Sequence, residues 1–378
     1  MPRRRAAPPK PEAPEAPLVD AKTMQQFASP LVPIESAFPA TSHAATKLAG
    51  LDTEMTAAPL NRAACRRLFT QKPNAAQQGQ RPPKLSSLTE EQKRAFSMGG
   101  AVQLHERYMH SDFHNSASKH RSGFTSHQFM TPFLSNLIEK CTPLADKCKR
   151  EDHFDPKRDP FACPAGYHQR ATGHFVCRAA ERYRPHIAGK RGFVIGSQWP
   201  WVESILFVAG VRELVTIEYA NATTDYPNYS VIHPDELVRQ FVAGSIPKFD
   251  FGFTFSSLEH DGLGRYGDPL NPTGDLESVA QAHCLLKPGG HFFFGVPTYH
   301  DKVYFNSHRE YGRLRLPLVF APFKLIDVIE GQVYINPSSP FPVIGKGKAQ
   351  GPDMIFVLNK TTVARSHAPA AAPTMRLL

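Results

Sequence analysis

With 378 residues, the chain is long enough for one large domain or two ordinary ones, and its 41% hydrophobic and 21% charged residues are typical of a globular protein. The net charge of +10 favours acidic partners. However, no basic stripe is interleaved with aromatic residues, so we expect no nucleic-acid binding. No stretch of about 18 apolar residues indicates a membrane span. The first residues also lack the apolar region of a secretory signal, so the cytosol is the default expectation.

The 35 prolines gather toward the two ends of the chain. Residues 1–45 contain the run "AAPPKPEAPEAP", and the composition predicts a disordered tail there. Residues 361–378 have a similar composition and predict a second tail. Between the tails, residues 46–184 predict a helical and loop-rich extension. Its two helix candidates are "SSLTEEQKRAFSMGG", which begins with capping residues, and "MTPFLSNLIEKC".

Four of the six cysteines fall within 37 residues of this extension: Cys141, Cys148, Cys163 and Cys177. Three histidines lie in the same segment: His153, His168 and His174. No C-x2-C pair, the usual cysteine spacing of zinc sites, occurs in this segment, so no metal ligands are assigned. Free thiols, two disulfides or a metal site all remain open, and disulfides would place the protein in an oxidising lumen. Cys65 and Cys284 are expected to be small core residues.

From residue 185 to residue 360 apolar runs alternate with helical segments. The predicted strands are "GFVIG", "ELVTIEYA", "FDFGFTFSS", "HFFFGVP", "FKLIDVIEG" and "DMIFVLNK". The predicted helices are "WVESILFVAG", "HPDELVRQFVAG" and "DLESVAQAHCLLKPGG". Strands that are apolar throughout, separated by helices, predict a doubly wound α/β fold with a mostly parallel sheet covered on both faces. Ligands of such sheets bind at the carboxyl ends of the strands, where "SSLEHDG" lies.

Two sets of motifs in this region resemble known families. "FDFGFTFSSLEH" followed by "LLKPGGHFFFGVP" resembles the fourth and fifth strands of class I S-adenosylmethionine-dependent methyltransferases. "VIGSQWPWVE", "GLGRYGDPLNPTGDLE" and "FNSHREYGRLRLP" resemble the DUF268 family over roughly residues 190–360. The resemblance implies a seven-stranded, Rossmann-like sheet and S-adenosylmethionine as the cofactor.

The resemblance also implies a set of cofactor-binding positions. A glycine after the first strand lets the backbone approach a ligand, and an acidic residue after the second can accept both hydrogen bonds of a ribose diol. The expected cofactor-binding residues are Gly196, Ser197, Glu218, Ser257 and Glu259.

The loop after the first strand departs from the pattern of active methyltransferases. It reads "GSQWPW" with one glycine, and Val194 stands where the family usually has an acidic residue two positions before that glycine. Trp199 and Trp201 add bulk at the position of the methionine moiety. Either these indoles form a wall of the cofactor site, or the site has changed its ligand or lost it.

Polar residues after the fourth and fifth strands predict an acceptor site. His260 and His308 are the expected catalytic bases, because histidine titrates near neutral pH. For His260 the alternative role is to cap the following loop together with Glu259. The expected substrate-binding residues are Arg265, Tyr266, Asp268, Asn271, Asn306 and Arg309.

The sequence therefore predicts a methyltransferase-like enzyme that acts on a polar small molecule or glycan. One alternative is a non-catalytic binding protein that kept the fold and lost the cofactor loop. Another is an enzyme that handles nucleotide sugars, for which no specific motif occurs. Fold alone does not decide among them.

Overall fold

The computed structural model describes residues 60–70, 83–108, 131–142, 170–197, 200–219, 222–298, 300–329 and 353–361. The predicted tail 1–45, most of the tail 361–378, Cys148, Cys163 and Trp199 lie outside these residues. None of the described helices combines the length and apolarity that a bilayer span requires.

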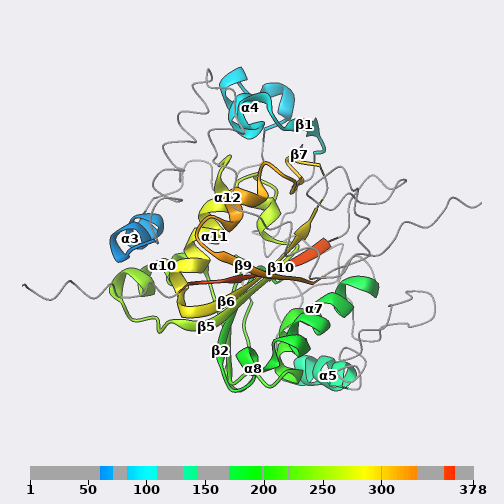
Figure 1. Cartoon of the computed structure of the whole chain (residues 1–378), viewed down its shortest axis with the longest axis vertical. Helices are drawn as coiled ribbons and strands as arrows, with labels where there is room; N and C mark the ends of the chain where they lie inside the picture. The colour runs from blue at the N-terminus through cyan, green and yellow to red at the C-terminus, as the bar shows by residue number, and fades with distance from the viewer. Residues whose placement is uncertain are drawn as a thin grey trace, which may run out of the picture.

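Seven strands form one twisted sheet in the order β4-β3-β2-β5-β6-β10-β9 (Figure 1). Their bounds are β2 Arg191–Ile195, β3 Glu213–Ile217, β4 Tyr229–Ile232, β5 Phe249–Phe255, β6 Leu286–Pro297, β9 Lys324–Ile329 and β10 Asp353–Asn359. Only β10 runs antiparallel to its neighbours in this sheet, since it pairs antiparallel with both β6 and β9. The expected mostly parallel, seven-stranded α/β sheet is therefore confirmed.

Two layers of helices cover the sheet, one on each face (Figure 1). One face carries α3 Arg62–Thr70, α10 Pro234–Ala243, α11 Gly274–Leu285 and α12 Leu316–Phe320. The other carries α5 Thr131–Cys141, α7 Arg170–Arg182, α8 Arg184–Ile187 and α9 Trp201–Val208. The predicted helices correspond to α4, α5, α9, α10 and α11.

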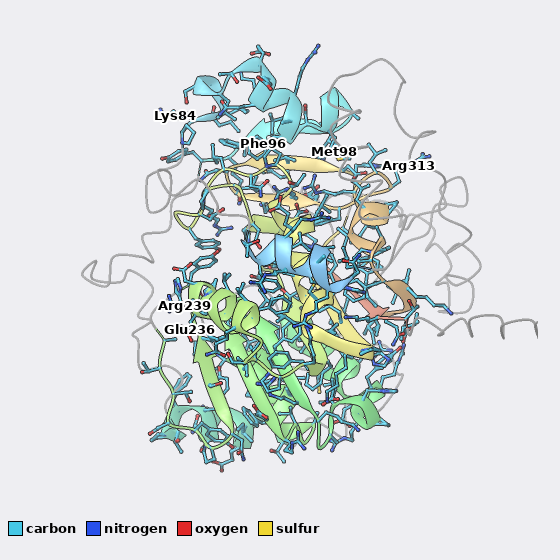
Figure 2. All side chains as sticks on the ribbon, turned by 90° about the vertical axis from the view of Figure 1, so that its left-hand side faces the viewer. Lys84, Phe96, Met98, Glu236, Arg239 and Arg313 are labelled. Atoms are coloured by element: carbon cyan, nitrogen blue, oxygen red, sulfur yellow. A yellow bond between two sulfur atoms is a disulfide. The ribbon has the colours of Figure 1, made fainter. Side chains whose placement is uncertain are left out.

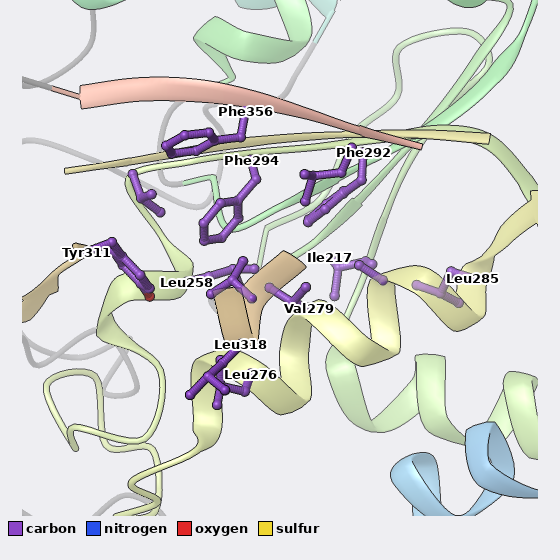
Figure 3. Close-up of a cluster of buried hydrophobic side chains, with 14 of the residues drawn as sticks. Ile217, Leu258, Leu276, Val279, Leu285, Phe292, Phe294, Tyr311, Leu318 and Phe356 are labelled. Carbon is purple, nitrogen blue, oxygen red and sulfur yellow. The ribbon is translucent and has the colours of Figure 1, made fainter. Parts of the chain in front are cut away.

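Local sequence explains where these elements begin and end. In β5 the phenylalanines at 249, 251 and 253 are fully buried, as expected of a central strand covered on both faces. α10 begins after His233, whose ring accepts the Asp235 N–H, and ends at Gly244 with a φ of 72°. In Figure 3, Phe292 and Phe294 of β6 pack toward α11 within the buried cluster on that face. "LKPGG" begins β6 rather than a loop after α11.

A second, three-stranded sheet lies beyond the carboxyl end of β6. It consists of β1 Gln103–Glu106, β7 Lys302–Phe305 and β8 His308–Glu310, and β1 pairs parallel with β7. Three short helices precede β1: η3 Leu85–Ser87, α4 Glu90–Phe96 and η4 Met98–Gly100. Phe96, labelled in Figure 2, packs edge-on against Phe305 with ring centroids 5.2 Å apart. The extension thus adds a strand to a hairpin that follows β6, while the domain boundary at 184/185 stays a prediction.

The cysteines correct one expectation. Cys65 and Cys284 are not separate core thiols but form a disulfide across 219 residues of sequence. The packing of α3 against α10 and α11 brings the two sulfur atoms together, which spacing in the sequence could not show. Cys141 and Cys177 are also disulfide-bonded. Within the described ranges, no group of three or more histidine, cysteine, aspartate or glutamate residues could hold a metal ion.

Candidate functional site

Gly196 directly follows β2 in a conformation that only glycine adopts easily. Its φ is +71°, and its N–H donates to the carbonyl of Ile217 at 3.0 Å. A Cβ atom at this position would collide with the side chain of Ser257, which follows β5. The backbones at the carboxyl ends of β2 and β5 are therefore in close approach.

Glu218 follows β3 at the same edge of the sheet. Its Oε2 atom accepts a hydrogen bond from the backbone N–H of Ser197 at 2.7 Å. This bond and the close approach of Gly196 to Ser257 bring Gly196, Ser197, Glu218 and Ser257 together at the ends of three neighbouring strands. Glu259, the fifth expected cofactor residue, is buried in η6 (Leu258–His260) and accepts a hydrogen bond from the Ser256 hydroxyl at 2.7 Å.

Tyr219 forms the rim of this edge. It is 43% exposed, and its ring meets that of His233 edge-on with centroids 5.5 Å apart. Partial desolvation, followed by the nearby carboxyl groups of Asp261, Asp268 and Asp235, raises the pKa of Tyr219. An exposed aromatic ring thus lies directly after β3, next to Glu218. The sequence offered a hint in "IEYA", where the tyrosine directly follows the strand-end glutamate.

A second carboxylate lies beneath the loop that follows β2. Glu203 of α9 is fully buried; its Oε2 accepts the Ser197 hydroxyl at 3.0 Å and its Oε1 accepts the Thr216 hydroxyl at 2.7 Å. Burial raises the pKa of Glu203 to about 7, against the opposing effect of these hydrogen bonds. The sequence analysis did not identify Glu203, although a glutamate in the otherwise apolar "WVESILFV" was a visible signal.

His260 lies enclosed between the loop after β5 and the β7–β8 hairpin. Its Nδ1 lies 2.6 Å from the carbonyl oxygen of Ser307, which can only accept, so the ring donates there. The other ring nitrogen lies 3.5 Å from the guanidinium of Arg265. Burial, followed by the charge of Arg265, holds the pKa of His260 well below its ordinary value. His260 is therefore neutral at pH 7, with both nitrogens close to fixed protein groups.

His308 differs from His260 in that one of its ring nitrogens lacks a hydrogen-bond partner among the described residues. Its Nδ1 lies 2.8 Å from the Ser307 hydroxyl, while its buried Nε2 has no hydrogen-bond partner among the described residues. Burial, and then the charges of Arg107 and Arg265, lower the pKa of His308 to about 4. The two histidine rings lie 6.4 Å apart between centroids.

Glu310 lies two residues after His308, on the same face of β8. In the described part of the chain neither carboxylate oxygen has a hydrogen-bond partner, and the nearest cation is Lys302 at 4.0 Å. Burial raises the pKa of Glu310 to about 7. A row of stacked rings continues this face, with His105 and His308 on either side of Tyr304. The sequence analysis missed Glu310, because no motif marks it.

The expected substrate residues divide into two groups. Arg265 and Tyr266 are partly exposed, with the guanidinium 5.2 Å from the ring centroid, and the Arg265 guanidinium also contacts His260. Asp268 is also partly exposed, but its carboxylate accepts the N–H groups of Gly264 and Tyr266, at 3.0 and 3.2 Å, and so shapes the loop. Burial raises its pKa.

The other three expected substrate residues are Arg309, Asn271 and Asn306, and each makes contacts within the protein. Arg309 is fully buried and donates to backbone carbonyls, among them that of Asp261 at 2.6 Å. The Asn271 side chain accepts the Thr273 N–H at 3.0 Å, and Asn306 is fully buried. A role of these three in binding stays a prediction, while the contacts of Arg309 and Asn271 stabilise the loop between β5 and α11.

Comparison with known proteins gave the following matches. Residues 189–337 match the model of the family described as Caenorhabditis protein of unknown function, DUF268. A search of curated proteins found no match.

Solved structures similar to the chain include the N-methyltransferase NodS from Bradyrhizobium japonicum WM9, with 13% identity and a TM-score of 0.33, over 50% of this chain and 97% of that one. They also include an S-adenosylmethionine-dependent methyltransferase from Mesorhizobium loti, with 13% identity and a TM-score of 0.30, over 49% of this chain and 97% of that one. The class I methyltransferase-like arrangement rests on the strand order described above, and the expected resemblance to DUF268 is confirmed over residues 189–337.

Proposed function

We propose that the chain binds S-adenosylmethionine at the carboxyl ends of β2, β3 and β5 and transfers its methyl group to a hydroxylated acceptor. The observation that supports this most strongly is the convergence of Gly196, Glu218 and Ser257 at one edge of the sheet. S-adenosylmethionine, when bound, supplies an electrophilic methyl group, so the protein mainly needs to orient the two reactants.

The residues present fit this cofactor. Gly196 turns the backbone where no side chain would fit against Ser257, Glu218 places a carboxylate beside this turn, and Tyr219 offers an exposed ring next to Glu218 for a flat base. In this arrangement Glu218 holds the ribose hydroxyls.

The acceptor site is proposed on the β7–β8 side of the same edge. His308 and Glu310 carry buried polar atoms, the ring Nε2 and the two carboxylate oxygens, that no described group satisfies. Such atoms are costly to bury, and a ligand hydroxyl would satisfy them. Of the two predicted histidine bases, His308 is favoured, because the ring of His260 already donates to Ser307. The acceptor is proposed to be a polar small molecule or a glycan.

The disulfides support an oxidising compartment over the cytosol. Disulfides persist in secreted and lumenal proteins and are rare in the cytosol. Since Cys65–Cys284 joins segments far apart in sequence, the attachment of α3 to the sheet domain as described depends on oxidation. We therefore propose the lumenal alternative.

Calorimetric titration with S-adenosylhomocysteine tests the cofactor site. Glu218→Ala should weaken binding at least about tenfold, since hydrogen bonds to a charged group contribute about 1.5–3 kcal/mol. Glu213→Ala is the matched control, because Glu213 begins the same strand at its other end and pairs with Arg191 at 2.7 Å. Absence of binding to the unmodified protein, or equal loss in both variants, would contradict the proposal and favour the non-catalytic alternative.

A further inference from the structure

The end of β2 lacks the acidic residue that class I methyltransferases usually carry two positions before the first glycine. Val194 occupies that position on β2. In the sheet, Val194 is the register partner of Thr216 on β3. Paired residues of adjacent strands point to the same face, so the Val194 and Thr216 side chains lie next to each other under α9. A carboxylate bonded to Thr216 therefore lies close to the place that an acidic residue at 194 would occupy.

The structure has such a carboxylate, contributed by the helix. Glu203 accepts the Thr216 hydroxyl with one oxygen and the Ser197 hydroxyl with the other. Because the Thr216 proton goes to Glu203, the Thr216 oxygen accepts a hydrogen bond from the Tyr229 hydroxyl at 3.0 Å. The Ser197 and Thr216 hydroxyls thus donate to the carboxylate directly, and Tyr229 donates to Thr216. Ser197 is held from two sides, because its backbone N–H donates to Glu218.

We infer that Glu203 supplies, from α9, the carboxylate that the end of β2 lacks, and that it positions Ser197 in the cofactor loop. This inference rests on the proposed function. Glu203 is a positioning residue, since it acts through Ser197 and is itself fully buried. Its carboxylate fixes which way the Ser197 hydroxyl donates.

Packing alone does not explain a glutamate at this position. The neighbours of Glu203 on α9 include Val202, Ile205 and Leu206, all buried against the sheet. An apolar residue would complete this surface without the cost of burying a carboxyl group. The presence of a buried carboxylate at position 203 is therefore best explained by the loop that it orients.

The test is the affinity for S-adenosylhomocysteine as a function of pH. The groups that face the Glu203 carboxyl are the hydroxyls of Ser197 and Thr216, with Tyr229 behind Thr216 and Glu218 on the far side of Ser197. The affinity of the unmodified protein should fall as the pH decreases through about 7, where Glu203 takes up a proton. In Glu203→Gln the affinity should be at least about tenfold weaker at high pH, and the part of the pH dependence due to Glu203 should disappear.

Glu181→Gln is the matched control. Glu181 is also a buried carboxylate, but it pairs with Arg184, which binds the carbonyl of Val208 at the other end of α9. This variant should bind the ligand with unchanged affinity and an unchanged pH profile. An equal loss in Glu203→Gln and Glu181→Gln, or an unaltered pH profile in Glu203→Gln, would overturn the inference.

A second measurement needs no ligand and separates failure of this inference from failure of the proposed function. Amide hydrogen exchange of the segment containing Ser197 should be faster in Glu203→Gln than in the unmodified protein, and unchanged in Glu181→Gln. If S-adenosylhomocysteine does not bind but exchange accelerates as expected, the proposed function fails while the positioning of the loop by Glu203 stands. If exchange at Ser197 is unchanged in Glu203→Gln, Glu203 does not hold the loop.

Discussion

The Cys65–Cys284 disulfide gives a prediction about how the extension is attached. α3 has nine residues, and only Cys65 and Phe69 are buried in it. Isolated helices of this length are marginal in water. The contacts of α3 include the stack of Phe69 on Phe241, with centroids 3.9 Å apart, and the hydrogen bond from the Gln281 side chain to the helix backbone. For a closed loop of 219 residues, the chain-entropy relation gives a contribution of about 5 kcal/mol at 25 °C.

We therefore expect the double variant Cys65→Ala/Cys284→Ala to release α3 while the seven-stranded sheet stays folded. Hydrogen exchange followed by mass spectrometry should show α3 amides exchanging near the rate of an unstructured chain, while β5 remains protected. Phe69→Ala with the disulfide intact serves as the control and should keep most of the α3 protection. Unchanged α3 protection in the double variant would refute the view that the cross-link holds the helix.

Three further predictions concern buried charges and the strand ends. Asp275→Asn should lower the free energy of unfolding by about 3–5 kcal/mol in urea titrations, because it leaves the buried Arg315 guanidinium without its carboxylate. Gly196→Ala should destabilise the protein by about 1–3 kcal/mol and abolish cofactor binding, since the new Cβ strains a left-handed residue and collides with Ser257. Folding raises the pKa of Glu203 from 4.5 to about 7, so the folded state binds this proton more tightly than the unfolded state. The free energy of unfolding of the unmodified protein should therefore decrease by up to about 3 kcal/mol as the pH rises from 4.5 to 7. Glu203→Gln should lack this decrease. An equal dependence of the free energy of unfolding on pH in both proteins would contradict this prediction.

Much of the α/β fold followed from local pattern. The buried strand of phenylalanines at 249–255 and the acidic start and glycine end of α10 have strong sequence periodicity and capping, so they were predictable. The grouping of Gly196 with Glu218 followed from the general rule that parallel strands end at one edge. These features depend on the pattern of neighbouring residues, which can be read directly from the sequence.

Features that depend on long-range packing could not be predicted. The pairing of β1 with β7 joins residues 103–106 to 302–305, and neither segment carries an alternating pattern strong enough to indicate a partner. Cys65 meets Cys284 only because α3 packs on α11. Arg309 was expected to face a substrate but lies buried against backbone carbonyls, a placement set by loop folding rather than by residue type.

The most direct test of the central claim is a crystal structure of the protein grown with S-adenosylhomocysteine. The account predicts density for the ribose between Gly196 and Glu218, with its hydroxyls on the Glu218 carboxylate and the adenine beside Tyr219. Ligand density elsewhere on the protein, or none at this edge under saturating ligand, would contradict it.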